Sequence, residues 1–117
     1  MKIEGENYLL EANEDATRVT IRGALRLNGL DEYAPVLDAL RAGIGAGSGD
    51  GRAMTLDLSG LEFLNSSGIA MLSKFVIEAR NLESMTLTIR GSATIPWQGK
   101  SLKNLQRLWP SLELVLG

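Results

Sequence analysis

The chain has 117 residues, a net charge of −2 and 44% hydrophobic residues. This length suits a single domain over residues 1–117, with a core that needs neither disulfides nor metals. The sequence contains no cysteine and no histidine, which excludes thiol nucleophiles, thiolate metal sites and every catalytic arrangement built on imidazole. We therefore expect a protein that is not an enzyme, without catalytic residues, cofactor or metal.

The first residues, Met1 to Glu6, lack the apolar stretch of a secretory signal. No window approaches the roughly 20 apolar residues that span a bilayer, so a cytoplasmic protein with no membrane partner is expected. The net charge argues against a nucleic-acid partner, although the charges are segregated. Residues 1–40 hold eight acidic and four basic side chains, whereas residues 80–110 hold five basic ones against Glu83 alone. Such segregation is typical of solvated faces and would also suit an acidic partner.

The first half of the chain predicts two strands and a helix. The strands cover residues 6–10 and 17–23, on either side of a turn-forming cluster. The helix has Asp31 as its N-cap and Pro35 in its first turn, where proline costs least. The glycine-rich stretch 43–51 follows a helix and lacks a terminal Gly-Lys-Ser/Thr, so it predicts a flexible connector and not a phosphate-binding loop.

The second half predicts three more strands and two helices. Apolar patterns indicate a buried strand over residues 53–58, a helix with inward positions over 69–79 and a strand over 85–89. Ser101 is a predicted cap of a short third helix, which precedes a last strand over 112–116. The order ββαβαβαβ predicts an α/β fold: a mixed sheet of about five strands with three helices and right-handed crossovers between the later, parallel strands.

The most informative segment is residues 56–69, which reads LDLSGLEFLNSSGI. An apolar strand and a short turn lead to Asn65, Ser66 and Ser67 at the start of a helix. Unpaired N–H groups and the helix dipole favour negative charge there, so a hydroxyl could carry a phosphoryl group. Gly68, without a side chain, would leave room for an approaching partner. Spacing alone favours the simpler alternative, in which these residues only cap the helix.

This segment resembles the signature of anti-sigma factor antagonists, the STAS domains of bacterial partner-switching systems. In that family a strand ending in Asp-Leu-Ser and an aromatic-containing turn lead to Asp-Ser-Ser/Thr-Gly-Leu at a helix start. Residues 23–25 also stand where the family carries Gly-Glu-Leu. The resemblance implies a STAS-like fold over nearly the whole chain. It also implies phosphorylation of Ser66, with Ser67 as the second choice, and places Asn65 where the family has Asp.

The resemblance implies a switch controlled by phosphorylation. In that family the unphosphorylated domain binds a serine kinase or anti-sigma factor of the histidine-kinase-like ATPase fold. Phosphorylation breaks the complex, and a PPM-type phosphatase restores it. We therefore expect these partners, and a role in signal transduction and the regulation of transcription. The partner-binding residues expected are Asn65, Ser66, Ser67, Gly68, Ile69 and Trp97.

Several alternatives stay open at this point. The domain could be a constitutive interaction module, with Asn65 marking loss of the switch, or a sensor of a nucleotide or another small molecule. Trp97 could pack over the end of the core instead of contacting a partner. Asp57 ends a buried strand, as the phosphoaccepting aspartate of response regulators does. That chemistry needs an acidic pair for Mg²⁺, and residues 17–23 offer only Thr and Arg among their polar side chains.

Overall fold

The computed structural model describes residues 1–14, 16–45, 52–82 and 85–117. The predicted α/β class, a mixed sheet with three helices, is confirmed, and the described part of the sheet has six strands. The additional strand is β1, which pairs antiparallel with β2. The predicted connector 43–51 lies mostly outside the described residues. In chain order the elements are β1 (Lys2–Glu4), β2 (Tyr8–Ala12), β3 (Arg18–Leu25), α1 (Gly29–Gly45), β4 (Arg52–Leu64), α2 (Ser66–Arg80), β5 (Met85–Gly91), α3 (Gln98–Leu108) and β6 (Glu113–Leu116).

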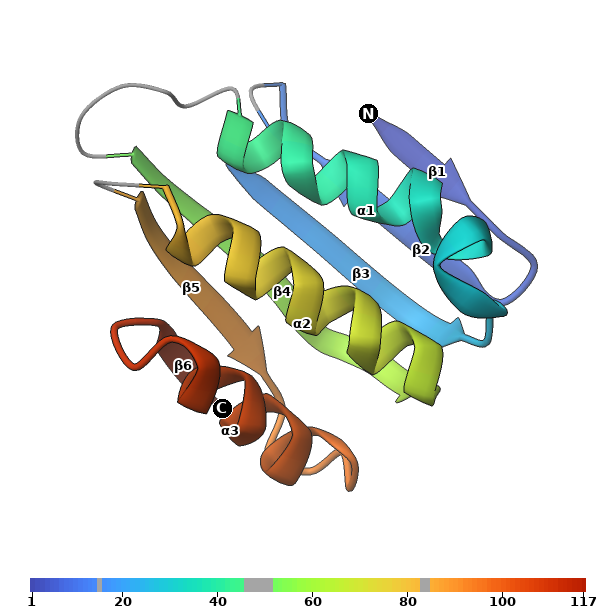
Figure 1. Cartoon of the computed structure of the whole chain (residues 1–117). Coiled ribbons are helices and arrows are strands. Elements are labelled where there is room, and N and C mark those ends of the chain that lie inside the picture. The colour runs from blue at the N-terminus through green and yellow to red at the C-terminus, as the bar shows by residue number, and fades with distance from the viewer. Residues whose placement is uncertain (15, 46–51, 83–84) are drawn as a thin grey trace.

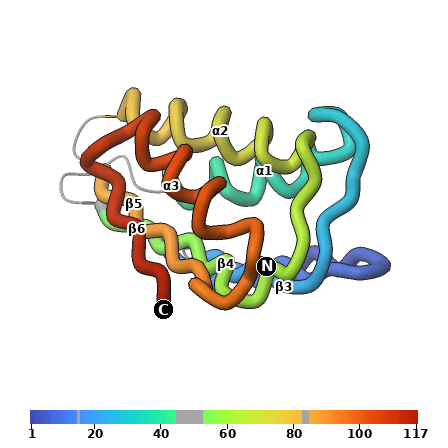
Figure 2. Tube along the Cα trace, turned by 90° about the horizontal axis from the view of Figure 1, so that it is seen from below, coloured from blue at the N-terminus to red at the C-terminus, as the bar shows by residue number. Residues whose placement is uncertain are grey.

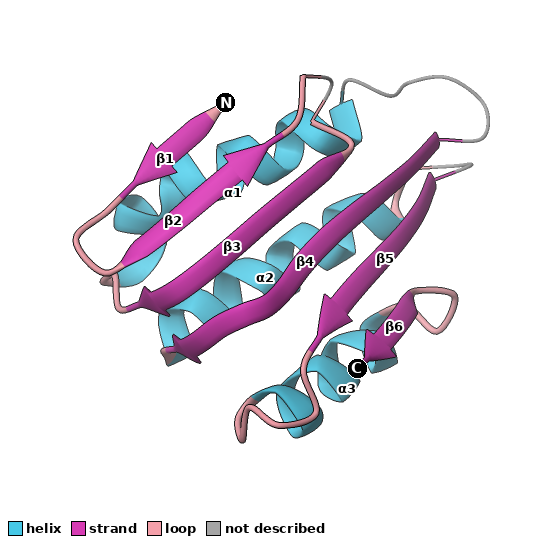
Figure 3. Cartoon of the chain, turned by 180° about the vertical axis from the view of Figure 1, so that it is seen from behind, coloured by secondary structure: helices cyan, strands magenta, loops and turns pink. Residues whose placement is uncertain are grey.

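The strands lie in the sheet in chain order, from β1 to β6. The first three are antiparallel, and β3 to β6 are parallel. Each helical crossover moves one strand further in the same direction, so right-handed crossovers place every helix on the same side. Figures 1 and 2 show α1, α2 and α3 together on one face of the sheet. Figure 3 shows the opposite face, which no element covers.

The core lies between the covered face of the sheet and the three helices. Along β3, Val19 and Ile21 are fully buried, while Arg18 and Arg22 point to the uncovered face. This period-two alternation is what a half-buried strand requires. The apolar positions predicted in the first two helices are buried too, except Ile69, which is half-buried. They are Tyr33, Val36, Leu37, Leu40 and Ile44 in α1, and Leu72, Phe75, Val76 and Ala79 in α2.

β4 runs to Leu64, well beyond the strand predicted over residues 53–58. Its pairing with β3 shifts register twice, and each shift adds one residue to β4. The buried positions therefore change from a spacing of two to a spacing of three after Leu58, which continues with Leu61 and Leu64. This change of period hides the second half of the strand from a pattern search, so the sequence suggests a turn there.

Two predicted helix starts are wrong. Helix α1 begins at Gly29, so Asp31 lies inside it and Pro35 is its seventh residue. The carboxylate of Glu32 accepts a hydrogen bond from the backbone N–H of Asn28 (3.1 Å), which satisfies a donor at this end. Helix α3 begins at Gln98, three residues before the predicted cap Ser101.

Gln98 explains the early start of α3, because it fills the place where β4 and β5 separate. The two strands pair only up to Asp57 of β4, so carbonyl groups further along β4 have no hydrogen-bond partner on β5. The Nε2 atom of Gln98 donates to the carbonyls of Leu58 (2.7 Å) and Leu61 (2.9 Å), and its Oε1 accepts from the N–H of Ser92 (2.6 Å). This fully buried amide replaces the missing ladder bonds.

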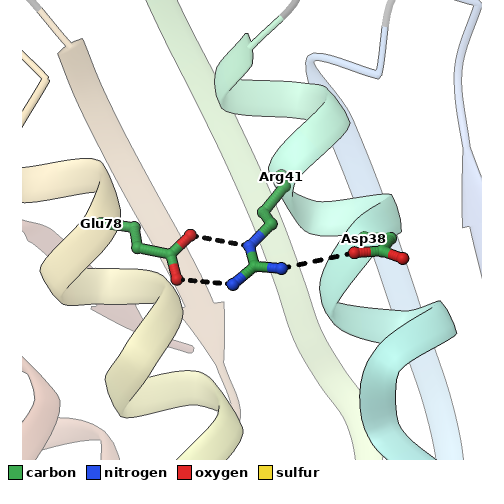
Figure 4. A network of polar contacts seen from close by, with 3 residues as sticks. All are labelled: Asp38, Arg41 and Glu78. Carbon is green, nitrogen blue, oxygen red and sulfur yellow. Dashed lines mark hydrogen bonds and ion pairs between the residues drawn. The ribbon is translucent and has the colours of Figure 1, made fainter.

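A charged network joins α1 to α2 on their outer sides (Figure 4). The guanidinium of Arg41 donates to both carboxylate oxygens of Glu78, at 2.7 and 2.8 Å, and contacts Asp38 at 3.4 Å. The hydrogen bond from Arg41 holds the pKa of Glu78 below its ordinary value. The bidentate geometry fixes how the two helices lie side by side.

Replacing Gln98 with Leu should lower the free energy of unfolding by about 2–4 kcal/mol, because three backbone groups each lose a hydrogen bond and only the carbonyl of Leu61 keeps another donor, the indole of Trp97. Urea unfolding followed by circular dichroism measures the change. Gln106→Leu is the matched control, since Gln106 is half-buried and makes one such bond, to the carbonyl of Leu112. Equal losses in the two variants would contradict the role assigned to Gln98.

Replacing Glu78 with Gln should make the free energy of unfolding less dependent on pH in the acidic range. The lowered pKa of Glu78 means that its contribution is present above about pH 4.3, the ordinary glutamate value, and is lost as the pH falls through the folded-state pKa. The free energy of unfolding should therefore depend less on pH in this window in Glu78→Gln than in the unmodified protein. An unchanged slope would show that the pair does not contribute.

Candidate functional site

Asn65 ends β4 and caps α2, and its side chain ties three segments together. Its Oδ1 accepts from the backbone N–H of Gly68 (3.0 Å) and from the hydroxyl of Tyr33 (2.7 Å). Its Nδ2 donates to the carbonyl of Leu27 (2.8 Å). An aspartate would keep the two acceptor contacts but would place a carboxylate oxygen against the carbonyl of Leu27. The local geometry therefore explains the amide where the STAS pattern has an acid.

Ser67 also serves the structure. Its hydroxyl accepts a hydrogen bond from the N–H of Gly29 (3.2 Å), the first residue of α1. Gly29 has φ +67°, a left-handed conformation that favours glycine at this helix start. The start of α2 thus caps the start of α1. Because this bond occupies the hydroxyl of Ser67, modification there would break a contact between helices.

Ser66 is the first residue of α2, and its side chain differs from those of Asn65 and Ser67 in its hydrogen bonding. It is exposed, and its hydroxyl makes no hydrogen bond to any other residue that the structure describes. It also stands where backbone N–H groups of the first turn and the positive end of the helix dipole lie. Of the two candidate phosphoacceptors, Ser66 is the one whose hydroxyl is free.

Gly68 is buried and faces the protein interior. It therefore leaves no room for a partner at the surface, in contrast to the expectation from the sequence. A Cβ at this position would lie 2.1 Å from Cδ1 of Leu64 and 2.8 Å from the hydroxyl oxygen of Tyr33. The missing side chain lets α2 approach the end of β4 and the side chain of Tyr33. Burial raises the pKa of Tyr33, which keeps its hydroxyl protonated as the donor to Asn65. Ile69, the next expected contact residue, is half-buried against the core.

Two large exposed apolar side chains are linked to the start of α2: Phe63 precedes Ser66 by three residues, and Leu30 follows Gly29, which contacts Ser67. Phe63, near the end of β4, is 40% exposed, and Leu30, in the first turn of α1, is 44% exposed. The guanidinium carbon of Arg26 lies 4.6 Å from the centre of the Phe63 ring. Register places Leu25, the neighbour of Arg26, beside Leu64. In the sequence, this surface could have been indicated by Phe63, an aromatic residue in the segment predicted to be a turn.

Trp97 makes the contacts expected of a packing residue. It is half-buried against the core, and its indole Nε1 donates to the carbonyl of Leu61 (3.0 Å). The same carbonyl also accepts from the Gln98 amide, so two side chains serve this group of β4 where β5 has diverged.

The described residues hold no cluster of three or more carboxylates that could bind a metal ion. Asp57 lies on the uncovered face of the sheet. Burial alone would raise the pKa of Asp57, but hydrogen bonds from Ser59 and the charges of Arg18 and Arg90 outweigh it, so its pKa is lowered. None of the helices in the part of the chain that the structure describes is long and apolar enough to cross a membrane.

The sheet order, the three helices on one face and the serine pair at the start of α2 define a small STAS-like α/β domain. No family model and no curated protein sequence matches the chain. Solved structures do match. Apo-SiaC from Pseudomonas aeruginosa superimposes with a TM-score of 0.71 and 16% identity, over 99% of this chain and 96% of the other.

Two further structures match equally well. One is SiaC of Pseudomonas aeruginosa, with a TM-score of 0.71 and 17% identity over 100% of this chain and 96% of that chain. The other is the crystal structure of the diguanylate cyclase SiaD in complex with its activator SiaC, in which the matching chain has a TM-score of 0.71 and 17% identity, with coverages of 99% and 97%. At these identities the likeness shows the fold, which is the STAS-like fold of SiaC.

The partners expected from the sequence resemblance need correction. The protein bound in the solved complex is a diguanylate cyclase, and neither a kinase or anti-sigma factor of the histidine-kinase-like ATPase fold nor a PPM-type phosphatase. The motif around Ser66 is short and is set by helix capping and packing, so it does not specify what the rest of the surface binds.

The loss of stability caused by three substitutions at the start of α2 should depend on the hydrogen bonds that each one removes. Asn65→Asp should lower the free energy of unfolding by about 1–3 kcal/mol, and Ser67→Ala by about 0.5–1.5 kcal/mol. Ser66→Ala should stay within about 0.5 kcal/mol of the unmodified protein, because its hydroxyl bonds to none of the described residues. Urea unfolding measures all three. A loss in Ser66→Ala as large as that in Ser67→Ala would mean that Ser66 too is structural.

Proposed function

We propose that this chain is a non-enzymatic regulatory protein that binds another protein through the surface around Ser66, and that modification of Ser66 controls this binding. The observation that carries the proposal is the difference between adjacent residues. Asn65 and Ser67 are engaged in holding the fold, whereas the hydroxyl of Ser66 is exposed and bonded to none of the described residues. The fold tolerates a change at Ser66 without losing a contact, which is what a reversible switch requires.

The surroundings of Ser66 support a protein partner. Phe63 and Leu30 present exposed apolar side chains at the same edge of the sheet, and Arg26 lies over the Phe63 ring. Interface cores combine such aromatic and aliphatic side chains with arginine. A phosphoryl group on Ser66 would add about two negative charges beside them. Binding of an apolar or acidic partner surface would then become unfavourable.

A diguanylate cyclase is the first partner class to test, because SiaC, which has this fold, activates one. We propose that this chain likewise binds a catalytic protein and alters its activity. The narrower function of an anti-sigma factor antagonist rests on the sequence motif alone, since the solved neighbours are SiaC. Constitutive binding and small-molecule sensing are the alternatives that the experiment must separate.

Ser66→Glu should weaken binding to a diguanylate cyclase from the same organism by about tenfold or more, whereas Ser66→Ala should bind normally. Calorimetry with the purified proteins measures both. Thr86→Glu is the matched control, because Thr86 is an exposed hydroxyl residue on β5 and not on α2. Phosphopeptide mapping of the protein purified from its own cells should place phosphate on Ser66.

The outcomes separate the alternatives. Tight binding by Ser66→Glu, with no phosphate on Ser66, would favour a constitutive module. Failure of the unmodified protein to bind cyclases would exclude that partner class. Unchanged binding in Phe63→Ala and Leu30→Ala would contradict the assigned surface.

A further inference from the structure

A pocket of about 290 Å³ is lined by residues on the uncovered face of the sheet. It lies where β4 and β5 separate after the pair Asp57 and Arg90, and we call it the β4–β5 pocket. Its side-chain lining comes from four different segments and is mostly polar. The lining includes Arg18 of β3, Asp57 and Ser59 of β4, Arg90 of β5, Ser92 just after β5, and Val115 of β6.

The charged side chains of the β4–β5 pocket are two arginines and one aspartate. The lining holds the guanidiniums of Arg18 and Arg90 and the carboxylate of Asp57, and the main chain of Gly117 completes it at the end of β6. Asp57 is well occupied: it accepts from the N–H and the hydroxyl of Ser59, at 3.0 and 2.6 Å, and contacts Arg18 at 3.4 Å. Its side chain is only 16% exposed. The carboxylate therefore positions the two cations and has little capacity left for a further donor.

Arg90 has unused hydrogen-bonding capacity. It is exposed and interacts with Asp57 through charge, but its guanidinium donates no hydrogen bond to another described residue. The side chain of Arg18 is half-exposed. One of its nitrogens lies 3.4 Å from Asp57, and its other N–H donors are available to a ligand. Two guanidiniums that converge on one concave space match the oxygens of a phosphate, which Arg binds in a bidentate manner.

Arg22 on the same face shows what an ordinary surface arginine does here. Its Nη2 lies 2.8 Å from Oε1 of Glu11 on the neighbouring strand, which satisfies its charge locally. Within the described ranges Arg90 makes no ion pair of this kind with a side-chain carboxylate, and Asp57, which it faces, is shared with Arg18 and Ser59. The difference between Arg22 and Arg90 is the reason to regard the β4–β5 pocket as a binding site.

We propose that the β4–β5 pocket binds the phosphate group of a small anionic ligand, either inorganic phosphate or a phosphate monoester, between Arg18 and Arg90. The pocket volume lies near the lower end of ligand sites, which suits a metabolite and not a larger cofactor. The hydroxyl of Ser92, which shares a hydrogen bond with Thr94 (2.8 Å), lies at the rim as an additional polar contact. This site is separate from the surface around Ser66, because none of its lining residues belongs to that surface.

Nuclear magnetic resonance of the ¹⁵N-labelled full chain tests the site. Inorganic phosphate and glycerol 3-phosphate are titrated separately at constant ionic strength, with glycerol and chloride as control solutes. We expect saturable shifts at the amides of Ser59, Arg90 and Ser92 at concentrations below about 10 mM. Saturation by phosphate alone identifies a phosphate site, and tighter binding of glycerol 3-phosphate identifies a monoester site.

Substitutions then assign the binding to the arginines. Arg90→Gln should weaken binding about tenfold or more, and Arg18→Gln should also weaken it. Arg22→Gln, on the same face, should bind like the unmodified protein. The side chain of Arg90 makes no hydrogen bond to the described residues, so an amide spectrum unchanged away from the substitution should show that Arg90→Gln is folded. The proposal fails if no saturable shift occurs, if the shifts centre on α2 or α3, or if Arg90→Gln and Arg22→Gln bind equally. None of these results bears on Ser66.

Discussion

The side-chain amide of Asn65 is the contact on which the arrangement at the end of β4 depends. It accepts from the first turn of α2 and from Tyr33 of α1, and it donates to the loop that follows β3. An asparagine amide accepts at its oxygen and donates at its nitrogen, so one short side chain serves all three partners. Because Asn65 and Ser67 fix the starts of two helices, Ser66 between them is left facing outward with a hydroxyl that the fold does not use.

Gly68 belongs to the same constraint. Its missing side chain allows α2 to lie against Leu64 and Tyr33, which brings Tyr33 within hydrogen-bonding distance of Asn65. The motif therefore has two different parts. Asn65, Ser67 and Gly68 build the helix junction, whereas the hydroxyl of Ser66 bonds to none of the described residues. A motif of this kind can persist in proteins with different partners, since most of it serves folding.

The topology keeps the two proposed binding surfaces apart. Crossovers in one direction put every helix on one face and leave the opposite face of the sheet polar and open. The surface around Ser66 lies at the edge where helices begin, with Phe63 and Leu30 beside it. The β4–β5 pocket lies behind the sheet, where Gln98 holds the two strands apart. A small ligand behind the sheet and a protein at the helix edge could bind at the same time.

Regular periodicity accounts for the parts of the fold that could be predicted. The inward faces of α1 and α2 and the alternation in β3 follow from burial of one face of each element, which is a local property of the sequence. The second half of β4 could not be found in this way, because each register shift against β3 changes its period. The start of α3 depends on Gln98, whose partners Leu58 and Leu61 lie about forty residues earlier in the chain.

The sequence by itself determined the fold class, the absence of thiol and imidazole chemistry, and the position of the serine pair at a helix start. These follow from composition, hydrophobic period and capping residues, which act over a few neighbouring positions. Only the tertiary structure decided which serine is free, since Ser67 is occupied by Gly29 of another helix. It also decided that Arg18 and Arg90 share Asp57, because strand register brings together residues that are far apart in the chain.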